Sequence, residues 1–92
     1  LYLPTSFSPN GDGNNDIYKA IGNNVSSFDL RIFNRWGELV FTSTNVALGW
    51  DGTYLNAPAP EGVYVVKVKA FNPLGKSLFD EKERKSTITL FR

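Results

Sequence analysis

The strongest constraint on the fold is a four-residue stretch, Asn34-Arg35-Trp36-Gly37, that stands between two apolar runs. Asparagine at the first position of a type I turn bonds its own backbone, and glycine at the fourth position takes a left-handed conformation at little cost. The flanking residues 28–33 and 38–41 are rich in apolar side chains. The sequence therefore predicts a β-hairpin over residues 28–41, with Arg35 and Trp36 at its tip.

The register of this hairpin depends on how the turn closes. If Gly37 forms a bulge, Asn34 faces Glu38. One face then carries Phe28, Leu30, Ile32 and Val40, and the other carries Phe33, Leu39 and Phe41. If Arg35 and Trp36 form a two-residue turn, a single face carries Leu30, Ile32, Leu39 and Phe41. The two-residue turn needs positive φ at two non-glycine residues, at roughly 1–3 kcal/mol each, so the bulge is favoured.

Turn signals recur along the rest of the chain, between short runs with strand periodicity. The clearest strand covers residues 63–71, where Lys67 and Lys69 mark the solvent face and the alternate positions are apolar. Further strands are expected at residues 1–7, 17–21, 76–79 and 86–91. About seven strands without a helical period predict an all-β fold, a small immunoglobulin-like antiparallel β-sandwich.

The composition limits the classes of protein to which the chain can belong. Ninety-two residues suit a single domain, residues 1–92, and no apolar run approaches the ~18 residues of a transmembrane helix. The net charge is +1 and the charged residues are scattered along the chain, which argues against nucleic acid as a partner. Without cysteine the fold depends on packing alone. Because the chain has no methionine, we expect it to be a fragment of a longer protein.

A loop rich in asparagine and aspartate follows the first expected strand. Oxygen-bearing side chains occupy every second position, with glycines among the residues between them: Asn10, Asp12, Asn14 and Asp16. Alternating oxygen ligands on a glycine-rich loop are one way to hold Ca²⁺. The same residues also suit turns in which each side chain bonds its own backbone, so both a calcium site and a metal-free loop stay open.

The two tryptophans have different expected roles. Trp50 precedes a tight turn at Asp51-Gly52, and we expect it to be buried at the end of the core. Trp36, at the hairpin tip, suits either burial or contact with a partner. Arg35 beside it could stack on the indole or reach a carboxylate, and either contact would be local structure.

Catalysis has little chemistry available in this chain. Histidine and cysteine are absent, which excludes Ser-His and Cys-His nucleophiles and makes zinc a poor fit. The carboxylates of Asp12 and Asp16 lie in an open polar loop that would not raise a pKa toward neutrality. We expect a protein that is not an enzyme and requires no cofactor.

Five motifs in order resemble the gliding-motility-associated C-terminal domain, the type B sorting domain of the Bacteroidetes type IX secretion system. The resemblance is carried by Phe7-Ser8-Pro9-Asn10-Gly11-Asp12-Gly13-Asn14-Asn15-Asp16, by residues 32–41, by Gly49-Trp50-Asp51-Gly52-Thr53, by Pro60-Glu61-Gly62-Val63-Tyr64 and by residues 87–92. It covers essentially the whole chain. It departs from the family's usual pattern at Lys85-Ser86, where Lys-Gly is commoner, and at residues 57–59.

The resemblance implies a C-terminal signal on a large, often adhesive, secreted protein. Such a domain directs its protein through the periplasm and the type IX translocon to the cell surface or the exterior of a Gram-negative bacterium. It implies a PorP-type outer-membrane protein as partner, and we expect the domain to be monomeric. A calcium-dependent carbohydrate-binding or adhesin module is the main rival, and a passive structural spacer is a third alternative.

Recognition is predicted to use the hairpin and the last strand. An edge-bearing sandwich can be recognised through its terminal strand or through an apolar patch on a hairpin face. The residues expected to contact the partner are Phe33, Arg35, Trp36, Phe41, Leu90, Phe91 and Arg92.

Overall fold

The computed structural model describes residues 1–9, 16–79 and 81–91, and every regular element in them is a β-strand. The strands are β1 (Ser6–Phe7), β2 (Ser27–Phe33), β3 (Leu39–Ser43), β4 (Thr53–Tyr54), β5 (Ala57–Pro58), β6 (Gly62–Phe71) and β7 (Arg84–Leu90). The all-β prediction is confirmed, and the arrangement is compatible with a small immunoglobulin-like sandwich.

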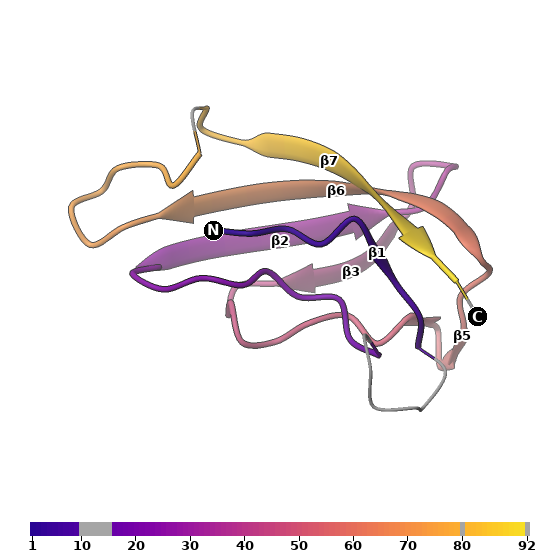
Figure 1. Cartoon of the computed structure of the whole chain (residues 1–92). Helices are drawn as coiled ribbons and strands as arrows, with labels where there is room; N and C mark the ends of the chain where they lie inside the picture. The colour runs from indigo at the N-terminus through magenta and orange to yellow at the C-terminus, as the bar shows by residue number, and fades with distance from the viewer. Residues whose placement is uncertain (10–15, 80, 92) are drawn as a thin grey trace.

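Five of the strands form one sheet in the order β1-β7-β6-β2-β3, and β4 pairs with β5 beside it (Figure 1). Pairing is antiparallel between β2 and β3, β2 and β6, and β6 and β7. The short β1 runs parallel to β7, so the sheet is mixed at this one edge. The long β6 lies between β2 and β7 and organises the sheet.

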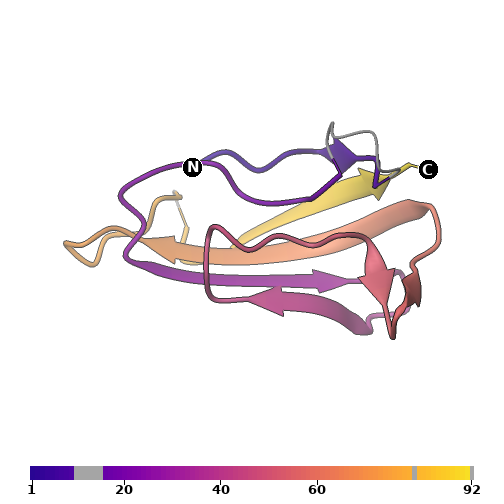
Figure 2. The ribbon, with the colours of Figure 1, turned by 90° about the horizontal axis from the view of Figure 1, so that it is seen from below.

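The second layer consists of extended segments that touch at single bridges. Tyr2 pairs with Ile21, and Tyr18 pairs with Trp50, each in antiparallel sense. Figures 1 and 2 show these segments running along one side of the five-stranded sheet. The strands expected at residues 1–7 and 17–21 are therefore reduced to these bridges and to β1. We call the segments around Tyr2, from Tyr18 to Ile21 and around Trp50, together with β4 and β5, the covering layer.

The core lies between the covering layer and the inner face of the sheet. Its centre is aromatic: the ring centroid of Trp50 lies 5.0 Å from that of Tyr64 and 5.5 Å from that of Phe7, which is 5.9 Å from Tyr18. Trp50 is fully buried, and its indole N–H donates to the carbonyl of Thr53 at 2.8 Å. The predicted burial of Trp50 is confirmed, and the hydrogen bond removes the cost of burying its polar atom.

The alternation of β6 separates the two faces of the sheet. Its inward side chains are buried: Tyr64, Val66, Val68 and Ala70. On the opposite side Val63 and Lys69 are exposed and Lys67 is half-buried. The lysines mark the solvent face, as the sequence predicts.

Two tight turns, one between β2 and β3 and one directly after β6, are closed by the same side-chain chemistry. In the first, the side-chain oxygen of Asn34 accepts hydrogen bonds from the backbone N–H groups of Trp36 and Glu38, both at 3.0 Å. In the second, at the other end of the sheet, Asn72 accepts from Leu74 at 2.9 Å and from Lys76 at 3.0 Å. Each asparagine side chain thus satisfies two backbone N–H groups of its own turn, so the turn can be short.

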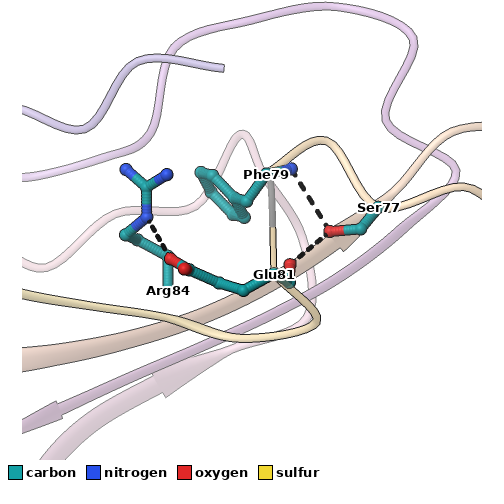
Figure 3. Close-up of polar contacts among 4 residues, drawn as sticks. All are labelled: Ser77, Phe79, Glu81 and Arg84. Atoms are coloured by element: carbon teal, nitrogen blue, oxygen red, sulfur yellow. Dashed lines mark hydrogen bonds and ion pairs between the residues drawn. The ribbon is translucent and has the colours of Figure 1, made fainter.

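The connection from β6 to β7 is fastened by short polar contacts (Figure 3). The Ser77 hydroxyl donates to the carbonyl of Glu81 at 2.7 Å and accepts from the N–H of Phe79 at 3.2 Å. Arg84 Nε lies 2.6 Å from the carboxylate of Glu81, and its guanidinium lies 4.9 Å from the Phe79 ring centroid. These contacts lie within the connection itself and hold Glu81 close to Arg84, the first residue of β7.

Candidate functional site

The hairpin tip has the bulged geometry that the sequence favours. The N–H of Asn34 donates to the carbonyl of Glu38 and the N–H of Gly37 donates to the carbonyl of Asn34, each at 3.0 Å. Gly37 has φ of 81°, a conformation that costs a side-chain-bearing residue about 1–2 kcal/mol. The predicted pairing of Asn34 with Glu38 is confirmed.

The register changes again one residue into the hairpin. Phe33 pairs with Leu39, but Ile32 pairs with Phe41, so Val40 is accommodated as an extra residue in β3. The prediction that Phe41 shares the face of Phe33 is wrong, because this second bulge turns Phe41 toward the inner face. Val40 and Phe41 are both half-buried and pack against the core.

The tip presents an exposed aromatic side chain held in place by its neighbour. Trp36 is 68% exposed, and the Arg35 guanidinium carbon lies 4.5 Å from the centroid of its ring. Of the two contacts that the sequence leaves open for Arg35, with the indole or with a carboxylate, the structure shows the one with the indole. Beside the tip is a shallow depression lined by Pro60 and Val63 as well as by Arg35 and Trp36. The Tyr64 hydroxyl fixes that corner by donating to the carbonyl of Pro60 at 2.7 Å.

The other predicted partner-binding residues lie in different surroundings. Phe33 is half-buried on the outer face, with the Lys67 ammonium 5.2 Å from its ring centroid. Leu90 is fully buried, so its side chain supports the fold and is not presented to a partner. Phe91 is 53% exposed. Arg92 lies outside the described residues.

The predicted calcium ligands fall mostly outside the described part of the chain. Asn10, Asp12 and Asn14 are not among the described residues, and Asp16 alone belongs to them. Elsewhere in residues 1–9, 16–79 and 81–91, no three acidic side chains gather in a way that could hold a metal. The calcium site stays a prediction.

On the outer face of the sheet, side chains line up across strands in a way that the sequence alone does not predict. Strand pairing places Arg31 opposite Lys67, and Lys67 opposite Lys85. Two residue pairs nearer the tip, and therefore on the same face, the pairing aligns Leu39, Phe33 and Val65. The alternation over residues 63–71 predicts a solvent-exposed face, but only the register between strands shows that the basic and the apolar side chains form rows across the sheet.

Comparison with known families now identifies the kind of domain. Residues 1–88 match the family described as the CHU_C type IX secretion signal domain. The chain belongs to this family. No curated protein matches the chain.

Membership gives the CHU_C domain its general role. It is a secretion signal that acts with the type IX secretion machinery, and its protein is destined for the cell surface or the exterior. This agrees with the resemblance in five motifs. Within the described residues, no helix is long and apolar enough to cross a membrane.

Proposed function

We propose that this domain is a non-catalytic C-terminal signal that carries a large surface or adhesin protein through the type IX translocon. The observation that carries the proposal is the family match over residues 1–88. The finer steps of the proposal are recognition by a PorP-type outer-membrane protein and retention of the cargo at the outer membrane.

The hairpin tip is the first contact surface of the proposal. Trp36 combines a large exposed aromatic ring with a backbone held by the hydrogen bonds of Asn34. Tryptophan and arginine are enriched among residues that dominate binding energy, and a preordered loop loses little entropy on association. Arg35 and Trp36 therefore form the anchor of the proposal, and the exposed side chain of Phe91 is a second apolar contact.

A reporter protein fused to the domain tests this role in a type IX-secreting bacterium. We expect the double variant Arg35→Ala and Trp36→Ala to lower reporter export by about tenfold, since both anchor side chains are removed. Export at the wild-type level in a folded double variant would refute the tip as the anchor.

The second asparagine turn supplies a matched control. Pro73 and Leu74 occupy the corresponding positions between Asn72 and Gly75, and Leu74 is 84% exposed. The double variant Pro73→Ala and Leu74→Ala removes a similar apolar tip at the opposite end of the sheet. Its export should match the wild type, with circular dichroism confirming the fold of both variants.

The carbohydrate-binding alternative makes a different prediction for the isolated domain. A sugar-binding module would be retarded on polysaccharide affinity gels in a way that depends on Trp36 and on Ca²⁺. A signal domain would migrate freely, and its deletion would trap the reporter in the cell. Calorimetric titration with Ca²⁺ tests the asparagine-rich loop separately.

A further inference from the structure

The outer face of the five-stranded sheet carries two parallel rows of side chains, and we call this surface the open face. The apolar row is Leu39, Phe33 and Val65, which are directly opposite one another on β3, β2 and β6. The basic row is Arg31, Lys67 and Lys85, directly opposite on β2, β6 and β7. The covering layer lies on the other side of the sheet, so both rows face outward.

Charge on the open face is strongly one-sided. The strand positions that point outward carry Arg31, Lys67, Lys69 and Lys85, against Asp29 as their one acid. Asp29 is engaged by Arg31, with 3.3 Å between carboxylate and guanidinium. The net charge of the whole chain is only +1, so the excess of cations is concentrated on this face of the sheet.

The basic row is unfavourable for the fold itself. Lys67 stands between two other cations on neighbouring strands, and like charges directly opposite destabilise a sheet. The contact of its ammonium with the Phe33 ring offsets this only in part, because such a contact contributes only about 0.5–1 kcal/mol where solvent reaches it. A residue that the fold does not favour at this position is a candidate for recognition.

We propose that the open face docks an acidic protein surface with an apolar centre, on the partner that recognises this signal. The proposal rests on the proposed function and names the chemistry of its partner. Carboxylates would lie over Arg31, Lys67 and Lys85, while apolar side chains cover Leu39, Phe33 and Val65. A protein fits better than a lipid surface, because Phe33 and Val65 are half-buried in the sheet and are therefore poorly placed to insert among acyl chains.

The substitution Lys67→Glu separates recognition from stability. It places a carboxylate between Arg31 and Lys85, so we expect the melting temperature of the variant to rise or hold. Export of the fused reporter should nevertheless fall by about tenfold, because the acidic partner now meets a like charge. Lys67→Gln should give a smaller fall in export. Export of both variants at the wild-type level would overturn the proposal.

The matched control is Lys19→Glu, which makes the same charge change on an exposed lysine of the covering layer. Its export should equal that of the wild type. An equal loss in Lys19→Glu and Lys67→Glu would show a response to net charge alone and would overturn the open face as the site.

A photo-crosslinking amino acid at Val65, with Leu74 as the control position, identifies the segment that covers the face. Support requires that the crosslinked segment contain Asp or Glu, and that changing these to Lys restore export of the Lys67→Glu variant. Vesicles of equal phosphatidylglycerol and phosphatidylethanolamine provide the competing test. Binding of the 92-residue chain to them that Lys67→Glu abolishes would assign the face to lipid and overturn the proposal.

Deletion of the whole domain distinguishes a failure of the signal role from a failure of the open face as the docking site. If reporter export survives the deletion, the proposed function fails. If deletion stops export but Lys67→Glu leaves it unchanged, the signal role stands and the open face is excluded as its docking site.

Discussion

At the scale of single residues, two asparagines determine how the tight turns after β2 and after β6 close. Asn34 and Asn72 each accept two backbone N–H groups, and the glycine three residues later takes φ near 80° in both turns. Asn34 also donates to the Glu38 carboxylate at 2.8 Å. The position of Trp36 thus depends on the side chain of Asn34, two residues before it.

Replacing Asn34 with alanine tests this dependence. The variant loses the acceptor for two backbone N–H groups, which water replaces in part because the turn is exposed, so we expect a loss of about 1–2 kcal/mol in the free energy of unfolding. Urea denaturation measures the change. Asn23→Ala, at an exposed asparagine outside both turns, should leave stability within about 0.5 kcal/mol of the wild type.

Tyr18 is a buried residue whose hydroxyl has no partner among the described residues. Burial raises the pKa of Tyr18 from 10.0 to about 12, with a smaller contribution from Tyr2. The folded protein therefore keeps its proton at a pH where the unfolded chain has lost it. The stability that this group contributes is complete below pH 10 and declines as the pH rises toward 12.

The variant Tyr18→Phe should remove that decline. Below pH 10 we expect the free energy of unfolding to hold or rise, because the variant leaves no buried hydroxyl unpaired. Between pH 10 and 12 the wild type should lose roughly 1–3 kcal/mol relative to the variant. Thermal unfolding at a series of pH values gives the difference, and parallel pH curves for the two proteins would contradict the expectation.

At the scale of elements, the structure differs from the local sequence pattern in two places, the edge strand β3 and the covering layer. The extra residue at Val40 turns Phe41 inward, although the alternation of residues 39–41 alone gives no sign of it. Likewise, residues 17–21 have strand character but pair only through single bridges to Tyr2 and Trp50. In both places the neighbouring segment decides the pairing.

Gly49→Ala tests the closeness of the covering layer. A Cβ there would overlap the carbonyl oxygen of Tyr18 and lie 2.7 Å from the Cβ of Lys19, so the bridge between Tyr18 and Trp50 must open. We expect a loss of about 2–3 kcal/mol and a weaker near-ultraviolet signal from Trp50. Gly37→Ala is the comparison, because nothing lies within 4 Å of its added Cβ. It should cost about 1–2 kcal/mol through its φ and leave the Trp50 signal unchanged.

At the scale of the whole molecule, the sheet has one covered face and one open face. The covered face contains the aromatic cluster of Phe7, Tyr18, Trp50 and Tyr64. The open face carries the basic and apolar rows and, at one end, the hairpin tip. A signal domain of this size can thus use one side of its sheet for stability and the other for recognition.

The sheet also depends on β7, which lies between β1 and β6. Removing residues 84–92 takes away Ile88 and Leu90, both fully buried, and leaves β1 without a pairing strand. We expect the shortened chain to be unfolded, as seen by far-ultraviolet circular dichroism and by collapse of the amide proton dispersion. Phe91→Ala in the full chain should keep the fold, since that side chain is largely exposed.

Much of the fold follows from local sequence. The alternation in residues 63–71 predicts β6 and its wet face, and Asn34 with Gly37 predicts the bulged turn. The burial of Trp50 follows from its place beside a tight turn. Of the predicted partner contacts, Arg35 and Trp36 are exposed and Phe33 lies on the outer face, whereas Leu90 is buried in the core. The row of Arg31, Lys67 and Lys85 was not predicted, because only the register between strands aligns it.

The sequence by itself determined the all-β class, the hairpin turn and, through five linked motifs, the family, because these depend on residues close together in the chain. The tertiary structure decided the inward turn of Phe41, the burial of Leu90 and the alignment of Arg31, Lys67 and Lys85. Each of these depends on register between strands. A shift of one residue exchanges the faces of a strand, and only the packing of the whole core selects one register.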